Sequence, residues 1–278
     1  MSITSAMSNG VSGLNSFSTA LEVTSDNVAN TGTTAFKSNA ARFGDMVSSY
    51  YNTQSKDTDR RGAGSVALGV ATDFAQGSFS TTTSWSDMAI NGQGYFAVAK
   101  ISLDDSGAAT VNGQTFYTRD GSFHVDKSGY LVNYQGYAVL GADGQPIRVE
   151  ATPNSPSHTN FYVDNKGQIW GYPTDTTLST DPEMIGNPVK IVIFPNEGGL
   201  IRKGGNLYSV GPESKSPIDV TNNETLRGDI AGYTLEGSNV DLAKEMVNMI
   251  IYQASYNANS KSITTARDML DTTINLVR

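Results

Sequence analysis

The feature that most constrains this chain is a heptad repeat of apolar side chains at each of its two ends. Near the start, apolar residues recur at alternating steps of four and three, the spacing of a helix that packs along one seam. This first seam consists of Ile3, Met7, Leu14, Phe17, Leu21 and Val28. The second seam recurs every seven residues as Leu242, Met249, Tyr256, Ile263, Leu270 and Val277, with Met246 and Ile274 at intervening positions. Residues 240–277 contain neither Gly nor Pro and therefore predict one long helix.

The two seams allow two packing arrangements. In one, the terminal helices close on each other as an antiparallel pair within a single chain. However, small or polar side chains interrupt both seams, so that an isolated pair would be marginal in water: Gly10, Thr24, Gln253, Ser260 and Arg267. Ile250, Ile251 and Tyr252 also make the second helix apolar around much of its circumference. We therefore expect these helices to pack against neighbours from other chains, with the seams as an assembly surface.

The segment after the first helix predicts a defined elbow. Asn27 and Asn30 tolerate the left-handed conformation that ends a helix, and Gly32 permits a turn. One interpretation is a simple helix stop with Phe36 as a hydrophobic plug. The other is an elbow that carries the chain from an axial helix to an outer body. The elbow residues are then Asn27, Asn30, Gly32, Phe36, Lys37 and Phe43.

Between the two ends the periodicity changes to two. Short runs such as "YFAVAK", "SFHVD" and "VKIVIF" alternate with Gly, Asp, Asn and Pro and predict strands. Asp-x-x-Gly turns occur at residues 104–107, 126–129 and 164–167, and the last two, within residues 125–131 and 163–169, predict hairpins. The expected fold class is α+β, with an antiparallel β domain of roughly a dozen strands. The expected division is an axial helix over residues 1–31, an elbow and connector over 32–65, a β-rich body over 66–234 and a second axial helix over 235–278, with residues 49–65 as a mobile or extended stretch.

Composition excludes several classes of function. The net charge of −8 repels nucleic acid, and the absence of cysteine excludes disulfides and thiolate sites. No apolar run is long enough to span a bilayer, and the first residues lack the layout of a cleaved signal peptide. We therefore expect neither nucleic-acid binding nor membrane insertion.

The sequence contains no recognisable catalytic constellation. His124 and His158, the two histidines, have no second histidine at metal-ligand spacing. The run "NGQGYF" lacks the third glycine and the following helix of a dinucleotide site, and "GGLIRKGGN" lacks the Gly-Lys-Ser/Thr order of a phosphate loop. We expect no catalytic residue, no cofactor and no metal.

Several motifs carry a resemblance to a known family. "DNVANTGTTAFKSNAARFGDMV" resembles the Asn-x-x-Asn…Thr-x-x-Phe-Lys segment of the bacterial flagellar axial proteins, the rod and hook subunits. "LEGSNVDLAKEMVNMIIYQASYNANSKSI" is similar to their carboxy-terminal block, and "DMAINGQGYFAV" and "YTRDGSFHVDKSGYLVNYQGYAVLG" resemble their β-domain motifs. The matches cover more than half of the chain. It departs from the family pattern at Ala35, where Gly is usual, and at Ala254, where Arg is common.

The resemblance implies a structural, non-enzymatic subunit that polymerises helically, with both terminal helices in concentric layers around a channel and the β domain outside. It also implies export through the flagellar type III apparatus without a cleaved signal, and contacts with other axial and junction proteins and a cap protein. The sequences "FKSNAARFGDM" and "EMVNMI" resemble the hook proteins most and favour the extracellular hook. A distal rod subunit of the periplasmic basal body is the close alternative, and an adaptor or tip protein of the same family is a further one.

A function of another class also fits the β-rich middle of the chain. A secreted carbohydrate-binding or hydrolytic β domain with dimerising helical tails would use Trp85 or Trp170 as an aromatic anchor. It predicts ligand binding by the β domain, whereas a purely structural subunit does not.

Overall fold

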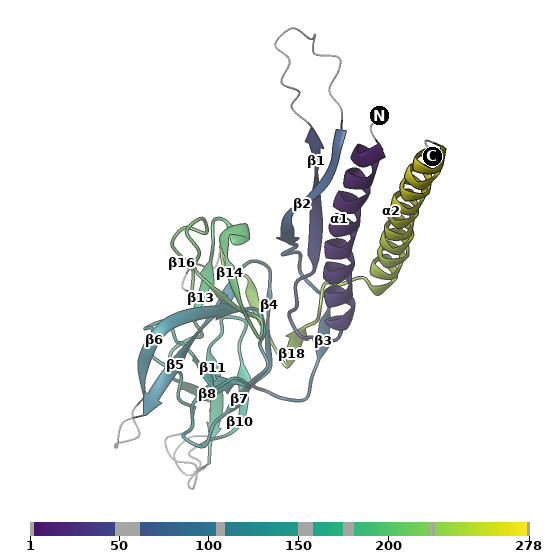
Figure 1. Ribbon diagram of the computed structural model, residues 1–278. Coiled ribbons are helices and arrows are strands. Elements are labelled where there is room, and N and C mark those ends of the chain that lie inside the picture. The colour runs from purple at the N-terminus through teal and green to yellow at the C-terminus, as the bar shows by residue number, and fades with distance from the viewer. Residues whose placement is uncertain are drawn as a thin grey trace. The chain divides into compact units, whose positions relative to one another are not determined.

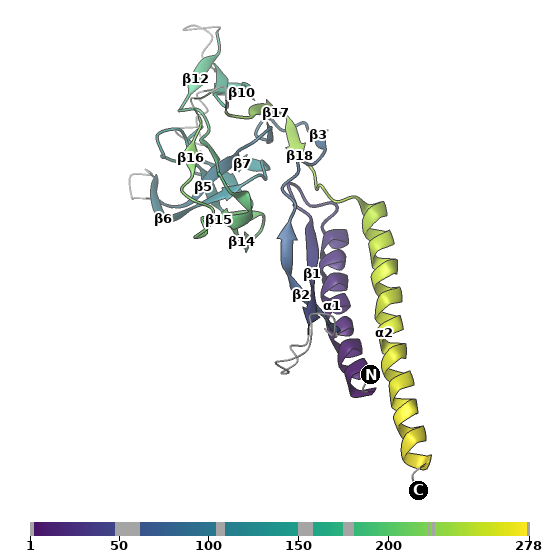
Figure 2. The ribbon, with the colours of Figure 1, turned by 90° about the horizontal axis from the view of Figure 1, so that it is seen from above.

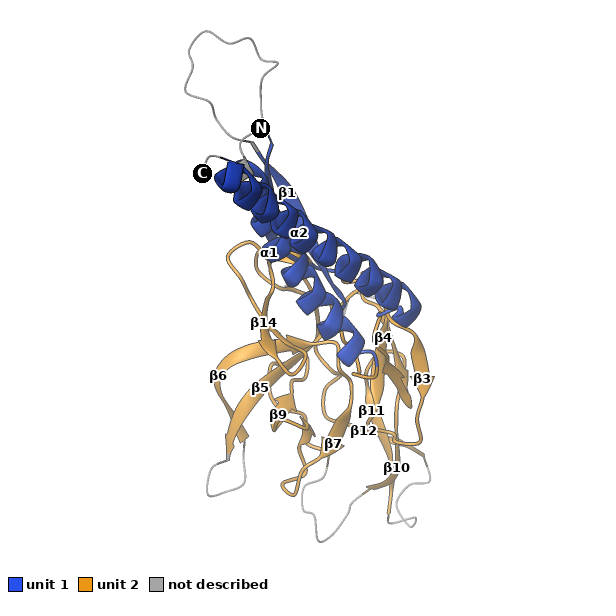
Figure 3. Ribbon diagram, turned by 45° about the vertical axis from the view of Figure 1, so that its right-hand side comes forward, with its two compact units in different colours: residues 1–31, 37–73, 240–278 blue, residues 32–36, 74–239 orange. Residues whose placement is uncertain are grey.

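The computed structural model describes residues 3–47, 62–103, 109–149, 158–174, 181–221, 223 and 226–276. The chain divides into two compact units (Figure 3). Unit 1 combines residues 1–31, 37–73 and 240–278, and unit 2 combines residues 32–36 and 74–239. Helices at both ends and an antiparallel β body make the fold α+β, which confirms the predicted class.

Unit 1 consists of two helices and a β-hairpin. Helix α1 spans Ile3–Ala29 and helix α2 spans Leu242–Leu276, while β1 (Asn39–Val47) pairs antiparallel with β2 (Gly62–Thr72). Figures 1 and 2 show α1 between the hairpin and α2, with the two helices antiparallel. The in-chain helix pair allowed by the heptads is therefore present. None of the described helices is both long enough and apolar enough to cross a membrane.

The hairpin differs from the connector expected over residues 32–65. Strand β1 and the start of β2 lie within that range, and residues 48–61, which hold most of the expected mobile stretch, lie outside the described residues. The hairpin is held by α1, because Ser65 N donates to Ser12 Oγ at 3.3 Å and Ser16 Oγ donates to Ser65 O at 3.2 Å. Gly64 has a φ of +102°, and a side chain there would overlap the Ser12 hydroxyl. These long-range contacts have no period that a local pattern could reveal.

Unit 2 is a β body. Its strands are β3 (Phe79–Thr81), β4 (Met88–Asn91), β5 (Tyr95–Leu103), β6 (Ala109–Thr118), β7 (Phe123–Val125), β8 (Leu131–Asn133), β9 (Tyr137–Val139), β10 (His158–Val163), β11 (Ile169–Pro173), β12 (Glu183–Ile185), β13 (Ile191–Ile193), β14 (Ile201–Gly204), β15 (Leu207–Ser209), β16 (Ile218–Asp219), β17 (Asp229–Gly232) and β18 (Thr234–Glu236), with a 3₁₀ turn at Glu197–Gly199. The largest sheet has the order β14-β15-β6-β5-β9-β8-β7, and β13 pairs with both β5 and β16. A smaller sheet has the order β10-β11-β12, and two further pairs are β17-β4 and β18-β3.

The predicted hairpin turns organise this body. Gly129 N donates to Asp126 O between β7 and β8, and Gly167 N donates to Asp164 O between β10 and β11, each at 2.8 Å. Both glycines have a positive φ, at +82° and +77°, as the turn requires. Both predicted hairpins are thus confirmed. The third Asp-x-x-Gly turn, at residues 104–107, follows the end of β5 at Leu103 and lies outside the described residues. The strands enclose an apolar core that includes Phe96, Phe123, Leu131, Ile169 and Ile191.

Candidate assembly surface

The contact between α1 and α2 depends on two glycines in α1. A Cβ added at Gly10 would lie 2.7 Å from Ile263 Cγ1, and one added at Gly13 would lie 2.7 Å from Asn259 Oδ1. Side chains at these positions would push α2 away, so glycine allows the backbones to approach closely. Gly10 interrupts the apolar pattern of the first seam, and in the structure it lies where α2 approaches α1 closely.

An aromatic cluster joins all three parts of unit 1. The Phe17 ring on α1 lies with its centroid 5.8 Å from Phe43 on β1 and 6.2 Å from Tyr252 on α2, and the Phe43 and Tyr252 rings are 6.4 Å apart. Aromatic pairs in this range stabilise by about 0.5–1.5 kcal/mol beyond the area that they bury. Phe43, predicted to dock the elbow, instead anchors the hairpin to the helices.

The first predicted seam matches the packed side of α1 in part. Its described side chains are partly buried: Met7, Leu14, Phe17, Leu21 and Val28. The side chain of Ile3 lies outside the described ones. The fully buried positions of α1 are small or polar, and they are Gly10, Gly13, Ser16, Ala20, Thr24 and Asn27.

The second predicted seam divides between two sides of α2. Met249, Ile263 and Leu270 are partly buried, whereas Leu242, Met246, Tyr256 and Ile274 are exposed, and Val277 lies outside the described residues. Tyr252, Asn259 and Ala266 complete the side that meets α1. None of the three belongs to the predicted seam. These three also recur every seven residues, so a helical wheel contains them, but a polar Asn and a small Ala give no apolar signal.

The part of α2 opposite this contact carries large apolar side chains in water. Its first turns expose Met246 by 55%, Val247 by 54%, Ile250 by 66% and Ile251 by 52%. We call these four residues the α2 outer face. Neighbouring exposed apolar side chains of this size mark a surface that another molecule covers. On the hairpin, Leu68 and Val70 of β2 are likewise exposed.

In unit 1 the predicted elbow begins with a cap on the end of α1. Asn30 Nδ2 donates to the Asp26 carbonyl oxygen at 2.9 Å and to its carboxylate at 3.0 Å, and Thr31 Oγ1 donates to Val28 O at 2.8 Å. Asn27 is buried and donates from Nδ2 to Asn39 O at 2.7 Å. Lys37 is buried as well. The asparagines therefore end the helix and fix the start of β1.

In unit 2 the elbow residues 32–36 are attached to the β body. Ala35 N donates to Glu236 O at 2.8 Å, and Asn206 Nδ2 donates to Thr34 O at 2.7 Å. Phe36 is 3% exposed, and the Arg202 guanidinium lies 5.1 Å from the centre of its ring. Gly32 is exposed, with open space where a Cβ would lie. Residues 32–36 therefore form a segment that is docked on the β body by both its backbone and the Phe36 ring.

Ala35 adopts a left-handed backbone conformation with a φ of +53°. It is the position where the resembling family usually has Gly, and glycine reaches this conformation without the steric cost that a Cβ brings. The departure from the family pattern therefore falls at a strained position.

A buried ion pair lies beside this segment. Arg119 Nη1 lies 3.4 Å from Glu236 Oε2, with the two side chains 6% and 0% exposed. Arg119 also donates to the carbonyls of Ile90 at 3.1 Å and Gly92 at 2.6 Å, and Glu236 accepts from Gly77 N at 3.0 Å. Removing either partner would leave a charge buried without compensation. The ion pair therefore links β18, the strand to which Ala35 of the elbow is bonded, to the Ile90 and Gly92 carbonyls at the end of β4.

The histidines are accounted for by structure. His124 packs against the Tyr134 ring, with centroids 5.2 Å apart, and His158 lies 3.6 Å from the Glu183 carboxylate. Across the described ranges, no group of three or more His, Cys, Asp or Glu side chains could hold a metal ion.

Comparisons with known proteins agree on the kind of protein. Three family profiles match: flagellar basal body rod FlgEFG protein C-terminal over residues 231–276, flagellar hook protein FlgE/F/G D1 domain over 89–171, and flagella basal body rod protein over 7–37. The flagellar basal-body rod protein FlgG of Bacillus subtilis is 32% identical, covering 97% of both chains. That of Agrobacterium fabrum is 30% identical, covering 95% of this chain and 96% of the relative.

A hook protein is similar as well. The flagellar hook protein FlgE of Helicobacter mustelae is 29% identical over 94% of this chain but only 59% of its own length. The three family profiles lie on α1 and the elbow, on the β body, and on β17, β18 and α2. The chain therefore belongs to the family of flagellar basal-body rod and hook proteins, which are structural subunits of the flagellum and not enzymes.

Proposed function

We propose that this chain is a distal rod subunit of the flagellar basal body, which polymerises helically into a hollow tube. The observation that carries the proposal is the α2 outer face. Burying one Ile or Met side chain stabilises by about 1.5–3 kcal/mol, so covering this face with neighbouring subunits offsets the entropy of ordering the helices. The seam residues exposed on the same helix, Leu242, Met246, Tyr256 and Ile274, belong to the proposed contact.

The rod is favoured over the hook by the coverage of the relatives. The rod proteins match over nearly their full length, whereas the hook relative is matched over only 59% of its length. The hook was the first interpretation, based on the sequences of residues 36–46 and 245–250. The comparisons do not support it, and we propose the rod in its place.

The polymer implies further partners and a place in the cell. As a rod subunit, the chain would contact other axial and junction proteins and a cap protein, and it would lie in the periplasmic basal body. It would reach that site through the type III export apparatus without a cleaved signal. These assignments follow from the proposed function.

Electron microscopy of the purified full-length protein tests the proposal. Raised salt screens repulsion between subunits of charge −8 and favours assembly. We expect straight tubes with a central channel. Curved tubes would return the assignment to the hook.

A matched pair of variants on α2 tests the surface itself. Ile250→Asp places a charge on the α2 outer face and should leave a folded protein that forms no tubes. Asn257→Asp adds the same charge at an exposed polar position of the same helix and should assemble like the wild type. Tubes from Ile250→Asp would contradict the role of the outer face. Circular dichroism of both variants checks that the fold is retained.

A further inference from the structure

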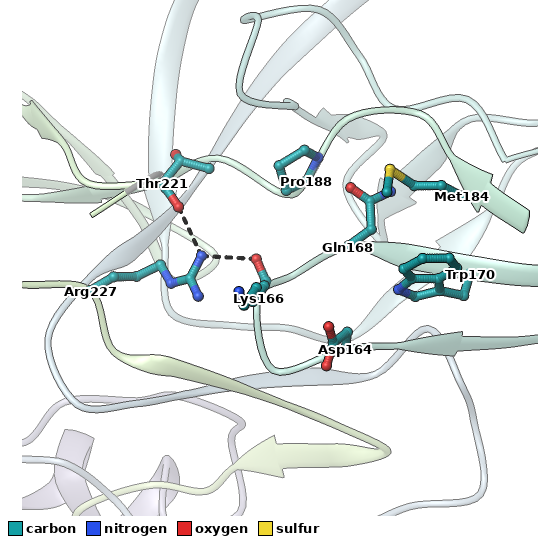
Figure 4. Close-up of a pocket in the computed structure, with 8 residues that line it drawn as sticks. All are labelled: Asp164, Lys166, Gln168, Trp170, Met184, Pro188, Thr221 and Arg227. Carbon is teal, nitrogen blue, oxygen red and sulfur yellow. Dashed lines mark hydrogen bonds between the residues drawn. The ribbon is translucent and has the colours of Figure 1, made fainter. Parts of the chain in front are cut away.

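Unit 2 contains a cavity that includes no residue of the α2 outer face. It has a volume of about 300 Å³ and lies between the β10–β11 turn, β12, Pro188, Thr221 and Arg227 (Figure 4). This volume is at the lower end of the range for small-molecule sites. The cavity therefore has room for one ring-sized group.

One wall of the cavity is apolar and aromatic. Trp170 on β11 lies opposite Met184 on β12 in the sheet register, and both line the cavity with Pro188 (Figure 4). Trp170 is also paired with Tyr162 on β10, and the two rings are parallel within 10° with centroids 6.5 Å apart. Tyr172 lies 6.4 Å from Tyr162 and is 40% exposed. The row of aromatic side chains thus continues from the cavity across one side of the sheet.

A buried amide supplies a fixed acceptor. Gln168 is 7% exposed, and its Nε2 donates to the carbonyls of Ile169, Ile185 and Gly186 at 3.2, 3.2 and 3.1 Å. These bonds fix the orientation of the amide. No hydrogen bond among the described residues occupies Gln168 Oε1, and this oxygen lies on the side of Pro188 and Lys166 in Figure 4. The cavity therefore offers an oriented acceptor to a hydroxyl or amide donor.

The opposite rim carries charged groups held in place. Arg227 Nη1 donates to Lys166 O at 3.0 Å and to Thr221 O at 2.8 Å, which ties two loops together (Figure 4). The Asp164 carboxylate accepts from Asn165 N at 2.7 Å, so that its direction is set by the turn. Carboxylate, guanidinium and ammonium groups on one rim suit a ligand with several hydroxyl or amide groups.

We propose that this cavity binds a pyranose ring of an oligosaccharide. The apolar face of the sugar would lie on Trp170, its hydroxyl groups would donate to Gln168 Oε1 and Asp164, and the next ring would lie on Tyr162. A flat apolar wall with fixed polar groups at its edge fits a sugar better than an extended peptide, whose recognition uses a sheet edge or a long groove. Of the two tryptophans considered as anchors, Trp85 packs against Phe161 beside the core, with ring centroids 4.8 Å apart, which leaves Trp170.

The two tryptophans allow a direct test in the full-length protein. Trp85→Phe leaves Trp170 as the single tryptophan, so its fluorescence reports on the cavity alone. We expect a saturable change when the β-1,4-linked tetramer of N-acetylglucosamine is added to this variant. Asp164→Asn in the same background keeps the turn acceptor but replaces a charged acceptor with a weaker neutral one, so it should weaken binding about tenfold.

A second variant and a matched control separate stacking from general effects. Tyr162→Ala should weaken binding roughly two- to tenfold, the range expected for one ring contact. Tyr134→Ala removes a tyrosine that is 81% exposed elsewhere in unit 2 and should leave binding unchanged. No saturable change at millimolar tetramer, or equal binding by Trp85→Phe and by Trp85→Phe/Asp164→Asn, would overturn the proposal. A Trp170 signal that follows protein concentration without sugar would overturn it too, in favour of a second copy of the chain. Tube formation is a separate readout, so that failure here leaves the proposed function standing.

Discussion

Asn27 in the last turns of α1 and Asn39 at the start of β1 are joined by two hydrogen bonds through one side chain. Asn27 Nδ2 donates to Asn39 O at 2.7 Å, and Asn39 N donates to Asn27 Oδ1 at 2.8 Å. The amide thus takes the place of a neighbouring strand and satisfies both backbone groups of Asn39. Asn39 Oδ1 in turn accepts from Thr72 Oγ1 at 2.9 Å at the far end of β2. One buried side chain therefore fixes helix and hairpin together.

Replacing Asn27 tests this connection. Asn27→Ala should destabilise unit 1 by about 2 kcal/mol, because two backbone groups lose their partner inside the unit. Asn27→Asp keeps an acceptor for Asn39 N but presents an oxygen to Asn39 O, so it should be no less harmful at neutral pH. Hydrogen exchange of the Asn39 amide measures the local effect. As a control, Asn15→Ala on the exposed side of α1 should leave exchange at Asn39 unchanged.

A variant and a matched control also test the backbone strain at Ala35 in the elbow. Ala35→Gly should stabilise unit 2 by about 0.5–1 kcal/mol, because glycine adopts a φ of +53° without the cost of a Cβ. Ala138→Gly, which removes the same methyl group from a buried strand residue, should destabilise instead. Urea unfolding of the two variants gives the difference. A loss of stability in Ala35→Gly would mean that packing of the methyl group outweighs backbone strain.

How far the sequence predicts this fold depends on whether a contact is local. The two terminal helices, the change to period two in the middle and the Asp-x-x-Gly hairpins all depend on neighbours within a few residues, and the structure contains them. The β1–β2 hairpin pairs Asn39 with Thr72, which are 33 residues apart in the sequence, and takes its support from serines of α1. Such a contact leaves no mark in either strand that distinguishes it from a polar connector.

The candidate site shows the same limit in finer detail. On α2 apolar residues occupy several sides, so that periodicity does not decide which side meets α1. Ile263 lies against Gly10, and Asn259 fits against Gly13 although it is polar. Ala266 is buried but too small to give an apolar signal. The exposure of Ile250 follows only once the partner of α2 within the chain is known.

Close approach of the helices predicts an unusual response to alanine. Gly10→Ala raises the helix propensity of α1 by about 1 kcal/mol, yet it should destabilise unit 1 by about 1–3 kcal/mol, because the new methyl group meets Ile263. In an Ile263→Ala background, which lacks the clashing Cγ1 atom, Gly10→Ala should cost less stability than in the wild type. Thermal unfolding followed by circular dichroism checks both. If Gly10→Ala alone raised the unfolding temperature, the helices would be packed less closely at this point than the geometry indicates.

Buried tyrosines predict how the β body responds to alkali. Burial raises the pKa of Tyr208, Tyr95 and Tyr117 above the unfolded-state value of 10.0. A folded-state pKa that is raised in this way contributes stability that is fully present below the unfolded-state pKa. This stability is lost as the pH rises from the unfolded-state pKa to the folded-state pKa. The free energy of unfolding of unit 2 should therefore fall above pH 10.0 as the unfolded chain releases these protons first.

Tyr208→Phe isolates one of these groups. The Tyr208 hydroxyl is buried and has no hydrogen-bond partner among the described residues, so its removal should leave stability at neutral pH unchanged or raise it by up to about 1 kcal/mol. The variant should also lose less stability above pH 10.0, while Tyr95 and Tyr117 keep part of the dependence. Tyr134→Phe, at a side chain that is 81% exposed, should match the wild type throughout. Urea unfolding at neutral pH and at about pH 11 gives both quantities. If Tyr208→Phe destabilised the neutral protein by more than about 1 kcal/mol, the hydroxyl would have a partner, such as a bound water, and the pH dependence would have to be assigned to the other two rings.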